Sequence, residues 1–258
     1  MESKIAIFIE REECKTMKVS ILDVLVDTYT RKEALAALMQ FLKEEKNHMV
    51  FTPNPEIVME AQKDRELLKI LNEADLVVPD GIGVVWASKF AKERITERVA
   101  GYDLIQALFN EIKDTEYTVY FFGGGKGVAE KAKQIMEQTY KNVKIIGVQD
   151  GYFDEEKEKI IIEDIKKQKP DILLVGLGVP KQEKWICKNK DLPVKISIGV
   201  GGSFDAMSGS LKRAPEFFIK YNLEWFYRLI KQPSRWKRQL RLPLFVLKVI
   251  TTRRQYDK

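Results

Sequence analysis

Short apolar segments alternate with segments of helical period along most of the chain, and this alternation constrains the fold more than any other feature. We expect strands at residues 19–25, 49–52, 76–78, 118–122, 143–147, 172–175 and 195–198. We expect helices near residues 31–45, 55–72, 82–93, 102–113, 127–139, 154–168 and 180–189. Because the strands are apolar along most of their length, both faces of the sheet should be covered. The sequence therefore predicts an α/β fold with a mostly parallel sheet covered by helices.

The loops that follow these strands are rich in glycine and small polar residues. They read TPNP at 52–55, PDGIG at 79–83, GGGKG at 123–127, GLGVPKQE at 176–183 and GVGGSFD at 199–205. In open α/β sheets, ligands bind beyond the carboxyl ends of the strands. Glycine permits close approach of the backbone, and helix N-termini offer N–H groups to anions. These loops predict a ligand that carries phosphate, and we expect a nucleotide.

Four polar side chains at the strand ends are candidates for chemistry, and each also has a structural alternative. Asp80 can act as a general base toward a hydroxyl, or it can cap the helix that follows; the pattern favours neither. Thr52 can merely close its strand, or its hydroxyl can share the site that we assign to Asp80. Asn54 precedes Pro55, as a helix N-cap does, and the structural role explains it better. Gln182 can bind a sugar hydroxyl or a uracil edge, or lie solvated on its helix.

Several classes of protein are disfavoured by what the chain contains. The glycines at 123–127 match neither the dinucleotide fingerprint nor a phosphate loop, which argues against a nicotinamide oxidoreductase, although a plain turn also explains them. With Cys14, Cys187 and the single His48, the chain has neither a four-thiolate nor a multi-histidine metal site. The chain also has no Asp-x-Asp pair, the motif with which many nucleotide-sugar transferases hold a divalent metal, so we expect no metal. If the ligand is a nucleotide whose pyrophosphate leaves in a reaction, backbone N–H groups and arginines would have to neutralise that charge.

The C-terminal part differs from the rest in charge. Residues 212–258 carry thirteen Lys and Arg against three acids, whereas residues 1–211 carry 31 bases and 35 acids. We therefore expect a core over 17–211 after an N-terminal extension at 1–16, and a basic helical appendage over 212–258, with helices at 216–231 and 234–251. Such a segment suits an anionic lipid surface, with an inserted apolar face. That face would consist of Leu242, Leu244, Phe245, Leu247, Val249 and Ile250.

Nucleic acid is the alternative ligand for a segment rich in bases and aromatic residues, in which case the core would only sense a nucleotide. The apolar run at 242–250 favours lipid over nucleic acid. No stretch of the chain is apolar enough to span a bilayer as a helix. We therefore expect a cytoplasmic protein attached peripherally to the inner face of the cell membrane. Whether it associates with itself stays open.

The motifs occur in an order that resembles the WecG/TagA/CpsF glycosyltransferase family, and most closely its TagA branch. The resemblance runs from about Val19 to the C-terminus, and includes RVAGYDL at 98–104 and FGG at 122–124 besides the loops above. It implies a Rossmann-like enzyme that transfers N-acetylmannosamine from UDP-N-acetylmannosamine to undecaprenyl-diphosphate-linked N-acetylglucosamine with inversion. The reaction would form a β-1,4 linkage and would be the first committed step of wall teichoic acid linkage-unit synthesis. A mannosaminuronic acid donor is the alternative within the family.

The same resemblance implies roles for individual residues. Asp80 matches the general base of the family and Thr52 its active-site threonine, while Asn54 and Gln182 fall in its substrate pocket. We also expect Arg98, Gly124 and Gly201, which lie in the shared motifs, to bind substrate. Three arginines of the appendage would reach the diphosphate at the membrane: Arg228, Arg235 and Arg238. No metal and no other cofactor is implied.

Overall fold

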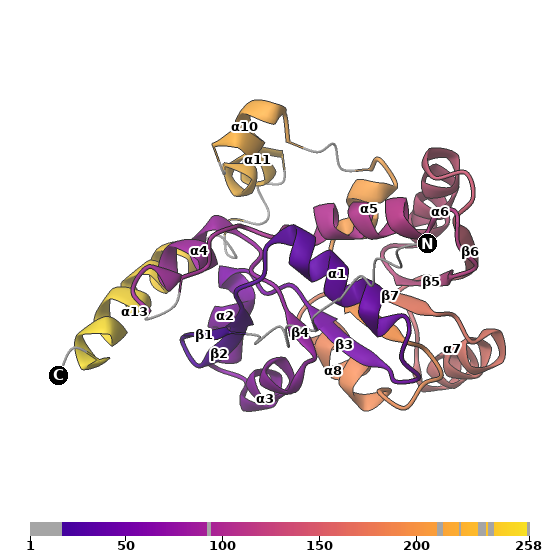
Figure 1. The fold of residues 1–258 in the computed structure, drawn as a ribbon, viewed down its shortest axis with the longest axis horizontal. Coiled ribbons are helices and arrows are strands. Elements are labelled where there is room, and N and C mark those ends of the chain that lie inside the picture. Colours follow the sequence, from indigo (N-terminus) through magenta and orange to yellow (C-terminus); the bar gives the residue numbers. More distant parts are fainter. Residues whose placement is uncertain are drawn as a thin grey trace, which may run out of the picture.

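A six-stranded parallel sheet forms the centre of the molecule (Figure 1). The computed structural model describes residues 17–91, 94–210, 214–221, 223–231, 236 and 240–256, with the side chains of 228 and 253–256 left out. The strand order is β4-β3-β8-β7-β5-β6. The strands are β3 (His48–Phe51), β4 (Leu76–Val77), β5 (Thr118–Gly123), β6 (Lys144–Gln149), β7 (Ile172–Gly176) and β8 (Ile196–Gly199). The predicted α/β fold with a parallel sheet is confirmed.

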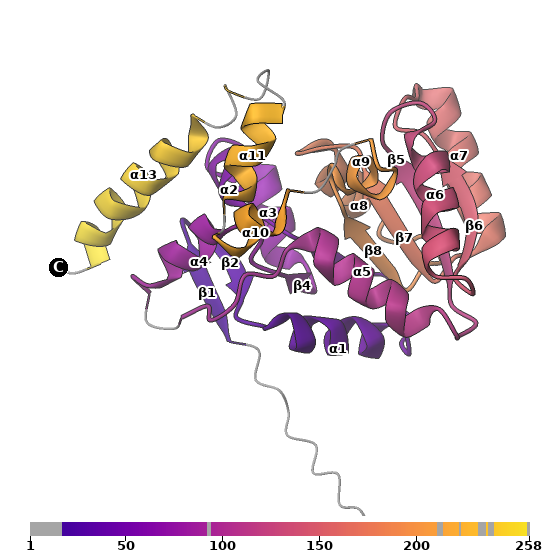
Figure 2. The ribbon, with the colours of Figure 1, turned by 90° about the horizontal axis from the view of Figure 1, so that it is seen from above.

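Helices cover both faces of this sheet (Figures 1 and 2). One face packs against α1 (Arg31–Phe41), α5 (Gly101–Ile112), α6 (Val128–Thr139) and α9 (Ser203–Met207). The other packs against α2 (Pro55–Ala61), α3 (Arg65–Glu73), α7 (Glu155–Gln168) and α8 (Lys181–Lys188). From Val119 to Phe122, successive residues of β5 point into opposite layers, and all four are buried. This explains why the strand reads as a continuous apolar run.

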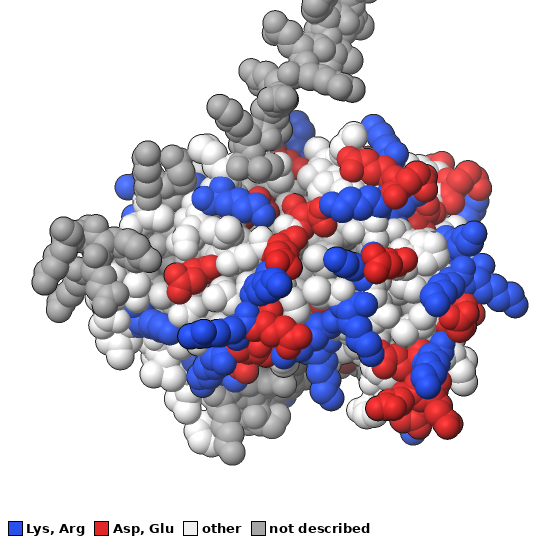
Figure 3. All heavy atoms as spheres, turned by 90° about the horizontal axis from the view of Figure 1, so that it is seen from below, with Lys and Arg blue, Asp and Glu red and all other residues white. Residues whose placement is uncertain are grey.

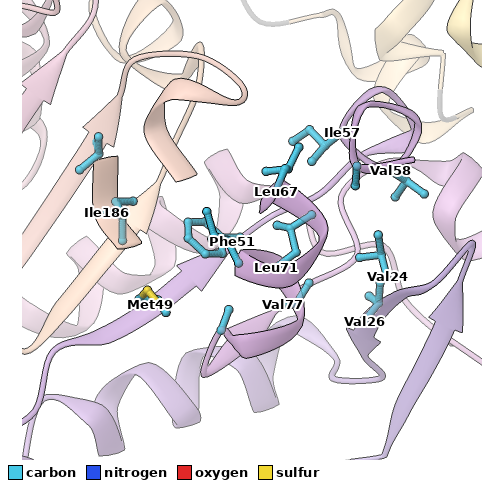
Figure 4. Close-up of a cluster of buried hydrophobic side chains, with 14 of the residues drawn as sticks. Val24, Val26, Met49, Phe51, Ile57, Val58, Leu67, Leu71, Val77 and Ile186 are labelled. Carbon is cyan, nitrogen blue, oxygen red and sulfur yellow. The ribbon is translucent and has the colours of Figure 1, made fainter. Parts of the chain in front are cut away.

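The core beneath α2, α3 and α8 joins distant parts of the chain. Figure 4 shows Phe51 of β3 and Val77 of β4 among Leu67 and Leu71 of α3, with Ile186 of α8 on the far side. Phe51 is 1% exposed and Val77 is fully buried. Because β3 and β4 are anchored by this packing, the loops that follow them start from fixed positions.

Three of the expected elements are wrong in detail. The single helix expected at 216–231 is two helices, Glu216–Lys220 and Glu224–Lys231. The strand expected at 19–25 is a separate antiparallel hairpin of β1 (Lys18–Ile21) and β2 (Val24–Asp27). Its turn places Leu22 and Asp23 at φ +49° and +65°, which is uncommon for residues other than glycine. The helix expected at 55–72 is two helices, because Asp64 caps a new helix by accepting from the N–H groups of Glu66 and Leu67.

The C-terminal helices lie over the β4 side of the molecule. They are α10 (Glu216–Lys220), α11 (Glu224–Lys231) and α13 (Arg241–Tyr256). Figures 1 and 2 show α13 beside α4 (Ile82–Ser88), and it also contacts α2, where Arg241 Nη2 lies 2.6 Å from Glu60 Oε2. The expected apolar face of this segment is corrected in part: Phe245 and Val249 are 1% and 7% exposed and belong to the core.

The face of the body seen in Figure 3 mixes charges of both signs. Lysines and arginines alternate there with aspartates and glutamates, in keeping with the nearly balanced charge of residues 1–211. The basic excess of the chain thus belongs to its C-terminal part. Among the described residues, no helix has the length and apolar character needed to cross a membrane.

Candidate active site

The loops after β3 and β4 lie side by side at one edge of the sheet and hold two of the candidate residues. Val78 N–H donates to Phe51 O at 3.0 Å, and Asp80 N–H donates to Pro53 O at 3.2 Å. The backbone pairing of the two strands therefore continues into the loops that carry Thr52 and Asp80. The two residues are thus on neighbouring loops at the same edge of the sheet, and that they form one site stays a prediction.

Asp80 does not cap a helix. The N-cap of α4 is Gly81, at φ +92°, and no side chain donates or accepts a cap hydrogen bond there. A Cβ atom at Gly81 would lie 3.2 Å from Pro55 Cδ, so the loop passes close to the start of α2. Asp80 is therefore not the N-cap of α4, which is one of the two roles that the sequence leaves open for it.

Asn54, by contrast, has the structural role. Its Oδ1 accepts from Ile57 N–H at 3.1 Å, which makes it the N-cap of α2, with Pro55 in the first turn. The amide oxygen of Asn54 is thereby committed to the helix. Its Cβ would be 3.6 Å from a Cβ at Gly81, so the residue still borders the loop of Asp80.

Thr52 packs against the start of α5. A Cβ atom at Gly101 would lie 2.9 Å from Thr52 Oγ1 and 3.2 Å from its Cγ2. Real Cβ atoms do not approach this closely, so only glycine at position 101 leaves the threonine in place. The segment before this helix is held by Val99 N–H, which donates to Pro79 O at 2.9 Å.

Arg98 is placed between two carboxylates from distant parts of the chain. Its Nε lies 3.9 Å from Asp80 Oδ1, and its Nη2 donates to Glu224 Oε2 at 2.8 Å. The Arg98 and Glu224 side chains are only 16% and 14% exposed. The sequence did not single out Glu224; its only distinguishing mark is that it is one of three acids in residues 212–258. Through it, α11 reaches the end of β4.

Gln182, Gly201 and Gly124 lie at the next strands along the sheet. Gln182 is 3% exposed, and its Oε1 accepts from Gly201 N–H at 3.0 Å. Gly124 N–H donates to Gly176 O at 2.9 Å. These two glycine N–H groups are therefore engaged inside the protein, and the glycines serve the close packing of neighbouring loops. A Cβ atom at Gly123 would lie 2.4 Å from Gly176 O.

Glu183 is a second residue that the sequence did not single out. It is 1% exposed, and its Oε1 accepts from Gln182 Nε2 at 2.9 Å. Burial raises the pKa of Glu183 to about 7, against the lowering effect of hydrogen bonds from its own N–H and from Gln182. Glu183 belongs to the motif at 176–183, but its neighbours in the sequence do not indicate that its carboxyl group is buried.

The arginines of the appendage are described only in part. Arg228 belongs to α11, the helix that carries Glu224, but its side chain lies outside the described residues. Arg235 and Arg238 lie outside them altogether, as do residues 1–16 with Cys14. Within the part of the chain that the structure describes, no three His, Cys, Asp or Glu side chains are grouped so that they could hold a metal ion.

A hollow of about 940 Å³ lies at the opposite end of the sheet. It is lined at the amino ends of the strands by Asn47, Asp75, Asp171 and Lys195, among others. His48 begins β3 at this end, stacks on Phe41 at 4.0 Å between ring centres, and has Glu44 and Asp75 within 3.2 Å. The sequence suggests a structural or surface position for His48, and the structure shows the first of these: the side chain is buried. The candidate residues among those that the structure describes follow the carboxyl ends of the strands, so this hollow is not their site.

Comparison with known proteins identifies the family of the chain. The family model described as "Glycosyl transferase WecG/TagA/CpsF family" matches residues 19–258. A protein of Bacillus subtilis is 40% identical over 203 residues, 78% of each chain, and one of Bacillus spizizenii is 38% identical over 219 residues, 84% of each. A protein of Staphylococcus aureus is 34% identical over 250 residues, 96% of this chain and 98% of its own.

All three relatives are named N-acetylglucosaminyldiphosphoundecaprenol N-acetyl-beta-D-mannosaminyltransferase. The family match covers the sheet, its helices and the C-terminal appendage alike. With residues 52–55 and 79–83 at the ends of β3 and β4, the motifs that carried the resemblance lie where an α/β enzyme binds its substrates. The chain is a glycosyltransferase that belongs to the WecG/TagA/CpsF family.

Proposed function

We propose that this enzyme transfers N-acetylmannosamine from UDP-N-acetylmannosamine to undecaprenyl-diphosphate-linked N-acetylglucosamine. The new bond is a β-1,4 linkage, formed with inversion as the first committed step of wall teichoic acid linkage-unit synthesis. The names of the three relatives support the acceptor and the transferred sugar. One observation carries the mechanism: Asp80 lies beside the Arg98 guanidinium, and its loop is hydrogen-bonded through the backbone to the loop after β3 that begins with Thr52.

The chemistry assigned to Asp80 is that of a general base. Its carboxylate takes the proton of the acceptor hydroxyl while that oxygen bonds to the anomeric carbon of the donor. The bond from the anomeric carbon to the UDP oxygen breaks in the same step, so UDP leaves with the electron pair. Proton transfer by a positioned carboxylate contributes about 10²–10⁴-fold in rate. Thr52, on the neighbouring strand, is assigned to hold the reacting sugar.

The departing UDP carries the charge that the protein must stabilise. We assign this to Arg98, together with Arg228, Arg235 and Arg238 of the appendage, because guanidinium groups bind phosphate oxygens in pairs. The donor lies along the ends of β8, β7 and β5, near Gln182, Gly201 and Gly124. No metal ion is required in this proposal.

The appendage is assigned to the membrane, where the lipid acceptor resides. On α13 the side chains of Leu244, Leu247 and Ile250 are 53%, 59% and 41% exposed, while Phe245 and Val249 of the same helix face the core. A helix with one apolar side free and basic residues around it suits the surface of an anionic bilayer. Attachment to the inner face of the membrane would bring the acceptor diphosphate to the β4 edge.

A transfer assay with a short-chain lipid-diphosphate acceptor tests the proposal. UDP-N-acetylmannosamine should be used, UDP-N-acetylmannosaminuronic acid should not, and a chelator should leave the rate unchanged. Asp80→Asn should lower the rate by about 10²-fold or more, with UDP affinity within about twofold in calorimetry, because the amide keeps the shape but not the basicity.

Glu97→Gln is the matched control, since this carboxylate lies next to Arg98 in the chain but accepts from Arg31 N–H of α1 instead. It should transfer at the wild-type rate. Full activity in Asp80→Asn removes Asp80 from the mechanism. If the enzyme uses UDP-N-acetylmannosaminuronic acid and not UDP-N-acetylmannosamine, the proposed donor is wrong.

A further inference from the structure

We propose that Glu183 is a positioning residue for the donor site, and that it acts through Gln182 on the turn that follows β8. Its carboxylate fixes the amide of Gln182, and this amide holds the N–H of Gly201. The inference rests on the proposed function in one respect: it takes the turn at 199–202 to lie against the UDP of the donor. The hydrogen bonds themselves do not depend on that assignment.

The orientation of the Gln182 amide is the first step. An amide group presents an acceptor oxygen on one side and a donor NH₂ on the other, in nearly the same shape. Gly201 N–H needs the oxygen, which it reaches at 3.0 Å. The NH₂ side donates to Glu183 Oε1 at 2.9 Å. Oε1 of Glu183 is the acceptor in this contact, and in its ionised form the carboxylate can only accept, so Glu183 favours the orientation of the amide that leaves the oxygen toward Gly201.

The position of the turn is the second step. A Cβ atom at Gly199 would lie 3.0 Å from Gln182 Nε2, so the amide packs directly against the backbone of the turn. A Cβ atom at Gly176 would lie 3.0 Å from Gly201 O and 2.6 Å from Phe204 Cδ2. The ends of β8 and β7 are thus in close contact. Gly124 N–H, bonded to Gly176 O, joins the end of β5 to them. A shift at Gly201 therefore reaches all three loops.

The burial of Glu183 is the third step. Its Oε2 is buried and has no hydrogen-bond partner among the described residues. Burying a carboxyl group with an oxygen unpaired is costly, and an apolar side chain of similar size would avoid that cost. The raised pKa of Glu183 has the same cause, loss of solvation. The carboxyl group is thus costly to stability where it stands, and the contact it makes is with the amide that holds the turn.

Two substitutions separate this role from simple packing. Glu183→Leu fills the space but cannot accept from Gln182, so the amide is free to turn and Gly201 loses its acceptor. Glu183→Gln can still present an oxygen to Gln182. Asp27→Asn is a control with a comparably buried carboxyl: Asp27 is 1% exposed, has an unpaired Oδ1 and accepts from Val77 N–H, away from Gln182.

The measurements are UDP affinity by calorimetry and the amide exchange rate of Gly201, with thermal unfolding recorded alongside. Glu183→Leu should weaken UDP binding by about tenfold or more and accelerate exchange at Gly201, because a buried hydrogen bond is lost. Glu183→Gln should restore both to near the wild-type values. Asp27→Asn should change unfolding alone.

Two results overturn the inference. One is that Glu183→Leu lowers the unfolding temperature but leaves UDP affinity and Gly201 exchange as in the wild type. The other is that Glu183→Gln is as impaired as Glu183→Leu. If the wild-type enzyme binds no UDP, the proposed function fails, whereas the exchange of Gly201 in the two variants still decides whether Glu183 holds the turn.

Discussion

Arg98 Nη2 lies 2.8 Å from Glu224 Oε2, across 126 positions of sequence, while Arg98 Nε lies 3.9 Å from Asp80 Oδ1. This contact links α11 of the appendage to the loop that carries the proposed general base. Both partners are largely shielded from water, so the pair is worth more than an exposed ion pair. Through Arg98, the position of α11 is therefore coupled to the loop that carries Asp80.

We expect Glu224→Gln to loosen α11 from the body. A hydrogen bond between charged groups contributes about 1.5–3 kcal/mol, and the amide retains only part of this. The measurement is limited trypsin digestion, since lysines and arginines are dense after residue 211. Cleavage in this region should be several-fold faster than in the wild type.

Glu216→Gln is the matched control for this experiment, because Glu216 is an exposed acid on α10. It should leave the rate of digestion unchanged. Equal rates for both variants and the wild type would mean that the Arg98–Glu224 pair does not hold the helix.

Gly101→Ala tests the packing of Thr52. The new methyl group would lie 2.9 Å from Thr52 Oγ1, so either the threonine or the start of α5 must move. Overpacking of this kind costs about 1–3 kcal/mol. We expect a lower free energy of unfolding in urea and a transfer rate reduced more than UDP affinity. A variant as stable and as active as the wild type would show that the two segments adjust without cost.

Glu183 should make stability depend on pH in a defined direction. Its pKa is raised from 4.5 to about 7 on folding, so the native state binds this proton more tightly than the unfolded chain. The stability that this gives is present below about pH 4.5 and is lost as the pH rises toward 7. The full effect is on the order of 3 kcal/mol.

Urea unfolding of the wild type and of Glu183→Gln at pH 5 and pH 8 checks this. Asp27, whose pKa is also raised by burial, is present in both proteins, so the comparison isolates Glu183. The variant should gain stability relative to the wild type as the pH rises. A constant difference between the two proteins would contradict the assigned pKa.

The two sides of α13 should respond differently to substitution. Leu244→Ser with Leu247→Ser removes exposed apolar surface and should reduce flotation with anionic vesicles, while thermal unfolding stays near the wild-type value. Phe245→Ala removes a ring that is 1% exposed and should cost about 3–5 kcal/mol of stability. Unchanged flotation of the double variant would argue against docking through this side.

The strands and their loops could be predicted from the sequence because their signals are local. The runs at 119–122 and 172–175 consist of apolar and aromatic residues throughout, as is typical of strands covered on both faces. The motifs at 52–55 and 79–83 follow such strands directly, so the edge of the sheet where they meet could also be predicted. The family resemblance rests on the same segments.

The hairpin at residues 18–27 could not be predicted in this way. Its turn uses Leu22 and Asp23 in the left-handed region, where an Asn-Gly or Asp-Gly pair would have been the usual signal. The break before α3 could not be located from residues 62–66, which are all polar and also suit the exposed face of one continuous helix; the cap by Asp64 becomes evident only from its hydrogen bonds.

By itself, the sequence determined the order of strands and helices, the loops that form the site and the family, because periodicity and motif are properties of neighbouring residues. Only the tertiary structure decided which side of α13 is buried, that Glu224 reaches Arg98, and that Glu183 lies against the amide of Gln182. These depend on which distant surfaces meet in the packed chain. Burial and pairing across such surfaces leave no trace in local sequence.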